Sequence, residues 1–208
     1  MSTASASALS EAGPTDPPWS ARYLVLPDSV PARVRQLATH LTGAAAGRFQ
    51  VATAIEDHLR SYQYSEVIAD PPAGRDLVDW FLFDERRGYC DYFSSAFVVL
   101  ARAAGIPARI AAGYSTGEFV EGTGTFRQYE SDAHTWPEVF FPEYGWIEFE
   151  PTSGDARIDR PVASAAPPQV EPDTTEVPTP AAALSDPTER ASPAAAGSKP
   201  RSRDGLGI

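Results

Sequence analysis

Cysteine occurs once in the 208-residue chain, as Cys90, and its setting suits a nucleophile. It directly follows residues 86–89 (RRGY), at the predicted start of a helix. The free backbone N–H groups and partial positive charge of a helix N-terminus favour a thiolate and could hold an oxyanion. A lone cysteine can also be a small buried apolar residue, so position alone leaves both interpretations open.

A histidine that could accept the thiol proton, His134, follows 44 residues later at the start of a predicted strand. An imidazole base serves a cysteine nucleophile when a third group orients the ring. A histidine at a strand end can equally be a plain surface residue. The other two histidines, His40 and His58, lie in helical patterns and are interpreted as ordinary residues there.

Three glutamates are candidates for the orienting group: Glu138, Glu148 and Glu150. On an extended chain Glu148 and Glu150 share one face, and Glu138 shares a face with His134. Pro137 interrupts the second register, because proline cannot donate to a strand ladder. Each glutamate could also be a solvated carboxylate on the outer face of a strand, so the pattern leaves the choice open.

The elements that would position these residues are helices first and strands later. Apolar residues at helical spacing predict helices over about 30–46 and 49–59, and an almost wholly apolar, central helix over 91–104. Strands are predicted over 108–114, 135–141 and 146–149, with a hairpin-like turn at 142–145, whereas 76–83 fits a short helix or a strand. Helices followed by strands indicate an α+β fold with an antiparallel sheet.

Composition divides the chain into three parts. All 22 aromatic residues lie between Trp19 and Phe149, so residues 19–154 are predicted to form the folded domain. Residues 1–18 are rich in Ser, Ala and Pro and are predicted to be a disordered lead-in. Residues 155–208 hold 9 of the 20 prolines and are predicted to be a disordered tail, because such a segment buries too little apolar surface to offset its ordering entropy.

Charge and composition exclude several function classes. The net charge of −11 leaves no basic stripe for nucleic acid or for an anionic membrane surface. One cysteine and scattered histidines give no zinc pattern, so neither a metal nor a cofactor is predicted. No run of about 20 apolar residues and no signal peptide is visible, so the chain is expected to be soluble and not to insert into a membrane itself.

Three ordered motifs resemble those of the transglutaminase-like superfamily. Residues 88–96 (GYCDYFSSA) resemble its cysteine motif, 133–139 (AHTWPEV) its histidine motif and 145–152 (GWIEFEPT) its acidic motif. Within the superfamily the chain most resembles bacterial membrane-anchored proteins, whose catalytic domain is extracytoplasmic. The resemblance implies a papain-like α+β fold in which helices pack on an antiparallel sheet and the central helix starts at the nucleophilic cysteine.

The same resemblance implies a triad of Cys90, His134 and Glu150. Cys90 would form a thioester with a glutamine side chain, releasing ammonia, and an amine would resolve it with His134 as base and acid. Glu150 stands where the family usually has Asp, and Glu148 is the reserve candidate. The implied partners are a protein or peptide glutamine donor and an amine acceptor, and the implied location is extracytoplasmic.

Two other uses of this domain remain open from the sequence. Water could resolve the same thioester, which would make the protein a cysteine peptidase, amidase or deamidase. The domain could also be a catalytically silent binding module. The presence of Glu150, where the family usually has Asp, adds weight to this possibility. Arg109 and Tyr114 match family positions and are interpreted as structural residues.

Overall fold

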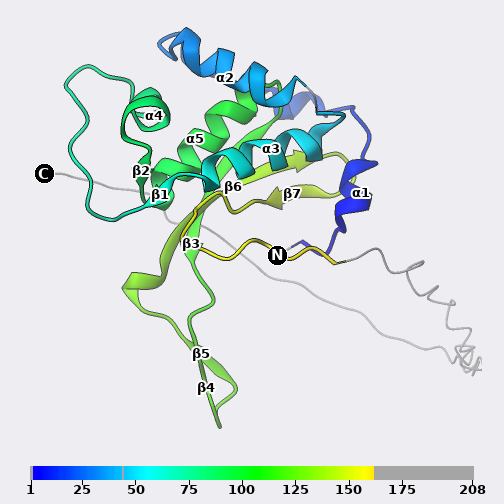
Figure 1. Cartoon of the computed structure of the whole chain (residues 1–208). Helices are drawn as coiled ribbons and strands as arrows, with labels where there is room; N and C mark the ends of the chain where they lie inside the picture. Colours follow the sequence, from blue (N-terminus) through cyan, green and yellow to red (C-terminus); the bar gives the residue numbers. More distant parts are fainter. Residues whose placement is uncertain (1, 44, 162–208) are drawn as a thin grey trace, which may run out of the picture. The chain divides into compact units, whose positions relative to one another are not determined.

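The computed structural model describes residues 2–43 and 45–161, which are coloured by sequence in Figure 1. The chain divides into two compact units, Met1–Pro167 and Pro168–Ile208, and the fold below belongs to the first. Most of the predicted disordered tail, residues 162–208, lies outside the described residues.

A three-stranded antiparallel sheet in the order β3-β6-β7 supports the domain. The strands are β3 (Ala108–Tyr114), β6 (Ala133–Phe141) and β7 (Gly145–Glu148). The central strand, β6, pairs with β3 over residues 133–139 and with β7 over residues 138–141. The three predicted strands and the antiparallel arrangement are therefore confirmed, with shifts of one or two residues at the ends of β6 and β7.

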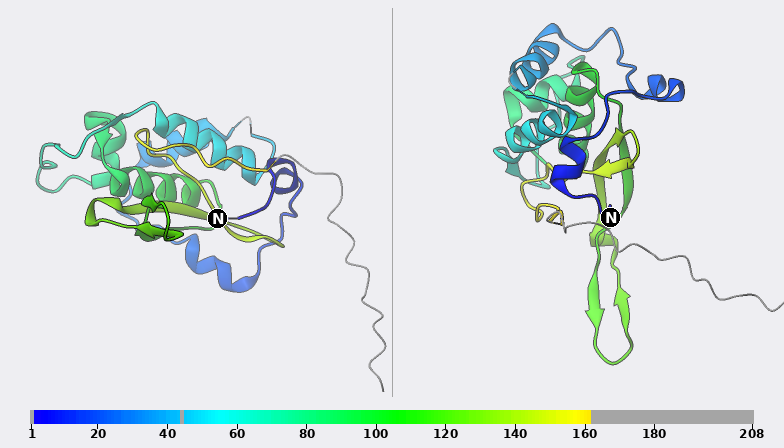
Figure 2. Two further views of the ribbon diagram at one scale, coloured as in Figure 1. Left: turned by 90° about the horizontal axis from the view of Figure 1, so that it is seen from below. Right: turned by 90° about the vertical axis from the view of Figure 1, so that its right-hand side faces the viewer.

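Helices cover one side of this sheet, as Figures 1 and 2 show. They are α2 (Ala32–Thr42), α3 (Arg48–Arg60) and α5 (Cys90–Ala103), and α5 contacts the sheet as well as the other two helices. Phe93, Phe97 and Leu100 of α5 are fully buried, which confirms a central helix. The α+β fold expected from the order of elements is observed.

The ambiguous segment 76–83 is helical. Asp76 caps α4 (Leu77–Trp80) by accepting a hydrogen bond from the Asp79 N–H at 2.9 Å, and a π-helical turn, η2 (Phe81–Glu85), continues it. The chain then enters β2 (Arg87–Gly88), which pairs in parallel with β1 (Gln63–Tyr64) and leads directly into α5. The sequence did not predict these two-residue strands, because alternation cannot show over so short a length.

A short helix in the first 18 residues differs from the predicted disordered lead-in. In α1 (Ala6–Ser10) the Ser5 hydroxyl caps the helix by accepting a hydrogen bond from the Ala8 N–H at 3.2 Å. Leu9 is only 1% exposed and joins the hydrophobic core. Asp16 ion-pairs with Arg48 of α3 at 2.8 Å. The contacts that attach the segment, which also include hydrogen bonds from the Ser2 N–H to Glu148, join residues far apart in the chain. Its Ser/Ala/Pro composition therefore does not reveal them.

A two-stranded hairpin connects β3 to β6 and projects from the domain, as Figure 1 and the right-hand view of Figure 2 show. It consists of β4 (Glu118–Val120) and β5 (Thr125–Arg127), and the sequence analysis did not predict it. Phe119 and Phe126 pack edge to face with ring centroids 5.2 Å apart, and both stay more than half exposed. Within residues 2–43 and 45–161, no helix combines the length and the apolar run that a membrane crossing requires.

The folded domain extends beyond its predicted end at residue 154. The Arg160 guanidinium donates a hydrogen bond to the Glu148 carbonyl oxygen at 2.6 Å and lies 4.8 Å from the Phe149 ring centroid. Arg157 ion-pairs with Asp57 of α3 at 2.5 Å. The start of the predicted tail, residues 155–161, is therefore packed on the domain, because its arginines find partners that composition does not reveal.

Ending the chain after residue 156 is expected to destabilise the domain relative to a chain ending after residue 161. The shorter chain loses the Arg160 contacts, worth about 1–2 kcal/mol together, and an exposed Arg157 pair that adds little. Thermal unfolding of the two chains measures the difference, expected as a drop in Tm of roughly 3–8 °C. Equal melting temperatures would show that these contacts are not stabilising.

Candidate active site

The structure brings Cys90, His134 and Glu150 together from three parts of the chain. Cys90 is the first residue of α5, His134 the second residue of β6, and Glu150 follows the end of β7. The Ser94 hydroxyl, one turn into α5, donates a hydrogen bond to the Thr135 carbonyl oxygen at 2.9 Å. This bond fixes the start of the helix against the strand that carries the histidine.

His134 contacts both other residues. Its Nε2 is 2.7 Å from Oε2 of Glu150, which leaves Nδ1 for the hydrogen bond with Cys90. The ring stacks on Trp136 with centroids 6.1 Å apart. A Cβ on Gly113, on the neighbouring strand, would come within 3.0 Å of the Trp136 ring, so glycine leaves the space that this ring occupies.

Glu150 is held rigidly. It is 6% exposed, and its Oε1 accepts a hydrogen bond from the Thr152 N–H at 2.9 Å while Oε2 contacts His134. Its own N–H donates to Oε1 of Glu56 at 2.8 Å, and its carbonyl oxygen accepts from Nη1 of Arg60 at 2.7 Å. Both carboxylate oxygens and both backbone groups therefore have partners, which fixes the His134 ring through Glu150.

The sequence analysis missed the support that Glu56 and Arg60 give to Glu150. Both lie on α3, one turn apart, and Glu56 is 8% exposed. The available signal was a carboxylate beside the apolar stripe of a predicted helix, with an arginine four residues later. Such a pair is usually read as a surface ion pair, and only the folded chain brings it to the acidic motif.

The other two candidate glutamates do not hydrogen-bond His134. Glu138 accepts a hydrogen bond from Nε of Arg109 at 2.6 Å, and Glu148 accepts hydrogen bonds from the Ser2 N–H at 2.8 and 3.1 Å. The two lie opposite each other in the β6–β7 register. Among the three carboxylates, only Glu150 bonds the imidazole, and Arg109 has the structural contact expected of it.

The electrostatics of the pair favour a charged nucleophile. Hydrogen bonds from His134 and then Thr135 lower the pKa of Cys90, against the effect of burial. Hydrogen bonds to Cys90 and Glu150 raise the pKa of His134 to about 10. Both shifts favour the form with a thiolate beside an imidazolium, in which a cysteine attacks a carbonyl carbon.

A cavity of about 390 Å³ opens beside His134. Its walls include Trp136 on β6, Tyr114 at the end of β3, and Asp155, Ala156 and Ile158 from the segment after the acidic motif. A reactive pair next to such a cavity is the usual arrangement of a substrate site. His134 and Glu150 line this cavity, and together with the half-buried Cys90, which lies outside its lining, they form the candidate active site.

One set of possible metal ligands coincides with this site. His134, Glu150 and Asp155 offer ligand atoms that lie within 4.8 Å of one another. Both ring nitrogens of His134 already have partners, Nε2 in Glu150 and Nδ1 in Cys90, so a metal ion would have to displace a hydrogen bond of the triad. The geometry suits a hydrogen-bonded acid–base group better than a metal centre.

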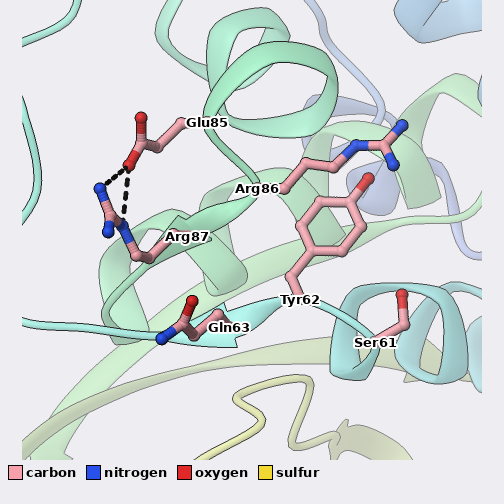
Figure 3. Close-up of a pocket in the computed structure, with 6 residues that line it drawn as sticks. All are labelled: Ser61, Tyr62, Gln63, Glu85, Arg86 and Arg87. Carbon is pink, nitrogen blue, oxygen red and sulfur yellow. Dashed lines mark hydrogen bonds and ion pairs between the residues drawn. The ribbon is translucent and has the colours of Figure 1, made fainter.

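A second cavity, of about 470 Å³, contains none of these three residues. Figure 3 shows its six lining residues, among them the Glu85–Arg87 ion pair at 2.6 Å and Arg86 beside the Tyr62 ring. Its serine hydroxyl, on Ser61, donates to the His58 carbonyl oxygen at 2.6 Å. The six lining residues include no pair in which a nucleophilic side chain contacts a base. The candidate reaction chemistry therefore lies at the first cavity.

Comparison with known proteins matches the domain to one family. The sequence profile of the transglutaminase-like superfamily matches residues 35–151, which include the three residues of the site. YebA from Bacillus subtilis is 49% identical over 143 residues, covering 65% of this chain and 19% of YebA. A protein-glutamine gamma-glutamyltransferase from Pseudomonas aeruginosa is 37% identical over 137 residues, covering 66% of this chain and 20% of that protein.

A solved structure has the same fold. The crystal structure of the periplasmic domain of TgpA from Pseudomonas aeruginosa, bound to ethylmercury, superposes with a TM-score of 0.58 at 36% identity. The match covers 66% of this chain and 50% of that one. The chain thus spans about a fifth of the two curated relatives and half of the solved domain.

Proposed function

The chain belongs to the transglutaminase-like superfamily, and on that premise we propose that it transfers the acyl group of a glutamine side chain to an amine through a thioester on Cys90. The observation that carries the proposal is the hydrogen-bonded series of Cys90, His134 and Glu150. The relative named protein-glutamine gamma-glutamyltransferase, 37% identical, supports this reaction.

In the first half-reaction the Cys90 thiolate attacks the carbonyl carbon of the glutamine amide. The backbone N–H groups at the start of α5 are suited to stabilise the oxyanion that forms. The His134 imidazolium gives its Nδ1 proton to the departing nitrogen, the C–N bond breaks, and ammonia leaves a thioester behind. His134 is then neutral and remains oriented by Glu150.

In the second half-reaction an amine attacks the thioester carbon. His134 accepts a proton from the attacking nitrogen at Nδ1, the new C–N bond forms, and the C–S bond breaks. The products are a substituted amide and the Cys90 thiolate, again beside an imidazolium. The buried Glu150 carboxylate, 2.7 Å from Nε2, stabilises the positive ring in both half-reactions.

Glu150 supports an active enzyme over a silent binding module. The extra methylene relative to the aspartate usual in the family does not separate the carboxylate from the imidazole, since Oε2 reaches Nε2 at 2.7 Å. The Thr152 N–H donates a hydrogen bond to Oε1, the other carboxylate oxygen of Glu150, so the longer side chain is fully accommodated. The arrangement retains each group that the reaction needs.

The similarity to the periplasmic domain of TgpA also supports an extracytoplasmic location. We infer that the domain acts there on protein or peptide substrates, as a part of a membrane-anchored protein. The acyl donor would present a glutamine on an accessible segment, because Cys90 lies at a half-buried helix start rather than deep inside the domain.

The test is incorporation of a labelled primary amine into a glutamine-bearing protein, with ammonia release followed in parallel. The wild type is expected to produce both signals, and the Cys90→Ala variant neither. The variant should keep its helical circular dichroism, because alanine suits the first turn of α5. Since Cys90 is the only cysteine, loss of thiol alkylation verifies the variant directly.

Each other outcome contradicts the transfer reaction in a different way. Cys90-dependent ammonia release without label would identify a deamidase, in which water resolves the thioester. Cleavage of a peptide bond without either signal would identify a peptidase. Absence of all three activities across varied glutamine substrates, together with an ordinary thiol reactivity of Cys90, would identify a binding module.

A further inference from the structure

One carboxylate beside His134 has no role in the mechanism above. The Asp155 carboxylate lies within 4.8 Å of the ligand atoms of His134 and Glu150, and it lines the cavity of about 390 Å³. Within residues 2–43 and 45–161 no hydrogen bond or ion pair to this carboxylate is present. A carboxylate with no direct hydrogen bond or ion pair therefore faces open volume next to the base.

The position of Asp155 is fixed by its backbone. Its N–H donates to the Thr152 carbonyl oxygen at 3.2 Å, and its own carbonyl oxygen accepts from Nη2 of Arg60 at 2.8 Å. The same guanidinium holds the backbone of Glu150, so the two carboxylates are placed by one arginine. Before Asp155, a Cβ on Gly154 would come within 3.1 Å of the Tyr64 ring, and glycine permits this close turn.

The charges around Asp155 favour a cation in the cavity. Burial and then the Glu150 carboxylate raise the pKa of Asp155, while the His134 imidazolium and then the Arg60 guanidinium lower it. Once the thioester has formed, His134 has given its proton to ammonia, and Arg60 alone of these two cations still offsets the two carboxylates. A cation that enters at this stage replaces the lost imidazolium charge and gains from two acidic neighbours.

Resting on the proposed function, we propose that Asp155 binds the ammonium group of the alkylamine acceptor and holds it beside His134. An alkylamine such as a lysine side chain arrives protonated, because its pKa is about 10.4. Of its two protons lost on transfer, one ends on Nδ1 of His134 and the other passes to solvent. The nitrogen joins the acyl carbon, the C–S bond breaks, and the thiolate is restored.

This assignment makes Asp155 a specificity-determining residue for the acceptor. Charge recognition selects an alkylammonium over water and over neutral nucleophiles. Hydroxylamine, which is uncharged at neutral pH, should not need Asp155. The two acceptors therefore separate binding of the ammonium from the chemistry at Cys90 and His134, which both acceptors share.

The experiment compares the wild type with Asp155→Asn, Asp155→Glu and the matched control Asp159→Asn, an exposed acid in the same segment. Thioester formation is followed as ammonia release from a glutamine peptide, and transfer is measured to a dye-labelled alkyldiamine and to hydroxylamine. In Asp155→Asn, kcat/KM for the alkyldiamine is expected to fall roughly tenfold or more, as for loss of a charge-assisted contact. Ammonia release and hydroxylamine transfer should fall by clearly less than alkyldiamine transfer does.

The controls locate any failure. Asp155→Glu is expected to recover part of the alkyldiamine rate, and Asp159→Asn should behave as the wild type. Equal loss of alkyldiamine and hydroxylamine transfer in Asp155→Asn would overturn the inference and leave the proposed function intact, because Asp155 would then act through His134. A wild type that releases no ammonia and forms no thioester would overturn the proposed function and the inference with it.

Discussion

The His134→Asn variant is expected to lose about 10²- to 10⁴-fold of its rate of thioester formation. Asparagine can neither stabilise the Cys90 thiolate as an imidazolium nor protonate the departing ammonia, and in the wild type His134 bonds both Cys90 and Glu150. The loss is measured as single-turnover ammonia release from a glutamine peptide. The fold should persist, since the ring lies at a strand start and not in the hydrophobic core.

The same variant is expected to move the alkylation profile of Cys90 to higher pH. Alkylation follows the thiolate fraction, which rises with pH through the cysteine pKa. In the wild type the hydrogen bond from His134 is the largest cause of the lowered Cys90 pKa. The alkylation rate is therefore expected to rise at lower pH than for a free thiol, whose pKa is about 8.5. Without the imidazole, the rise should move up toward or past the free-thiol value.

His40→Asn is the matched control for both measurements, because His40 is exposed on α2, outside the site. Its rates and its alkylation profile should equal those of the wild type. Iodoacetamide rates that rise at the same pH in the wild type, His134→Asn and His40→Asn would mean that His134 does not lower the Cys90 pKa. The proposed acid–base role of His134 would then lack its physical basis.

Local pattern was sufficient to predict the elements that carry Cys90 and the sheet. The stripe of Phe93, Phe97 and Leu100 predicted α5 because helical periodicity is set by neighbours in the chain, and the family comparisons confirm the fold. The pair β1 and β2, the β4–β5 hairpin and α1 were not predicted. Each is short, and α1 and the β1–β2 pair also depend on contacts with distant residues, as Leu9 in the core illustrates.

The site shows the same division between local and distant information. The motifs pointed to Cys90 and His134, but strand parity left three glutamates open. That parity assumed an extended chain through residue 150, whereas β7 ends at Glu148 and the following turn is held by Glu56 and Arg60 of α3. Asp155 was assigned to a disordered tail for the same reason, since Arg60, which holds it, lies 95 residues away.

Glu150→Gln is expected to slow acyl transfer by on the order of 10²- to 10⁴-fold, comparable with the loss of the orienting carboxylate in other triads. Glutamine keeps the size of the side chain but removes the charge that stabilises the imidazolium, 2.7 Å away. Glu150→Asp keeps the charge on a side chain one methylene shorter, which is expected to lengthen the contacts with the Thr152 N–H and Nε2 of His134. Its rate should therefore lie between those of the wild type and Glu150→Gln.

The pH profile distinguishes this electrostatic role from mere packing. The hydrogen bonds to Cys90 and Glu150 raise the pKa of His134 to about 10, and the imidazolium must persist to protonate ammonia. Activity that needs the imidazolium is lost as pH rises through that pKa. Removing the Glu150 charge lowers the pKa, so the basic limb of thioester formation should move to lower pH in Glu150→Gln.

Glu138→Gln is the matched control, because Glu138 is a strand carboxylate that bonds Arg109 and not His134. Its basic limb should remain where the wild type has it, even if loss of the Arg109 contact lowers Tm slightly. A basic limb that stays in place in Glu150→Gln, or that moves equally in Glu138→Gln, would contradict the assignment of Glu150 as the residue that holds the imidazolium. A shift of the basic limb that occurs only in Glu150→Gln would show that this carboxylate stabilises the His134 imidazolium. Glutamate would then perform the role that aspartate usually has at this position in the family.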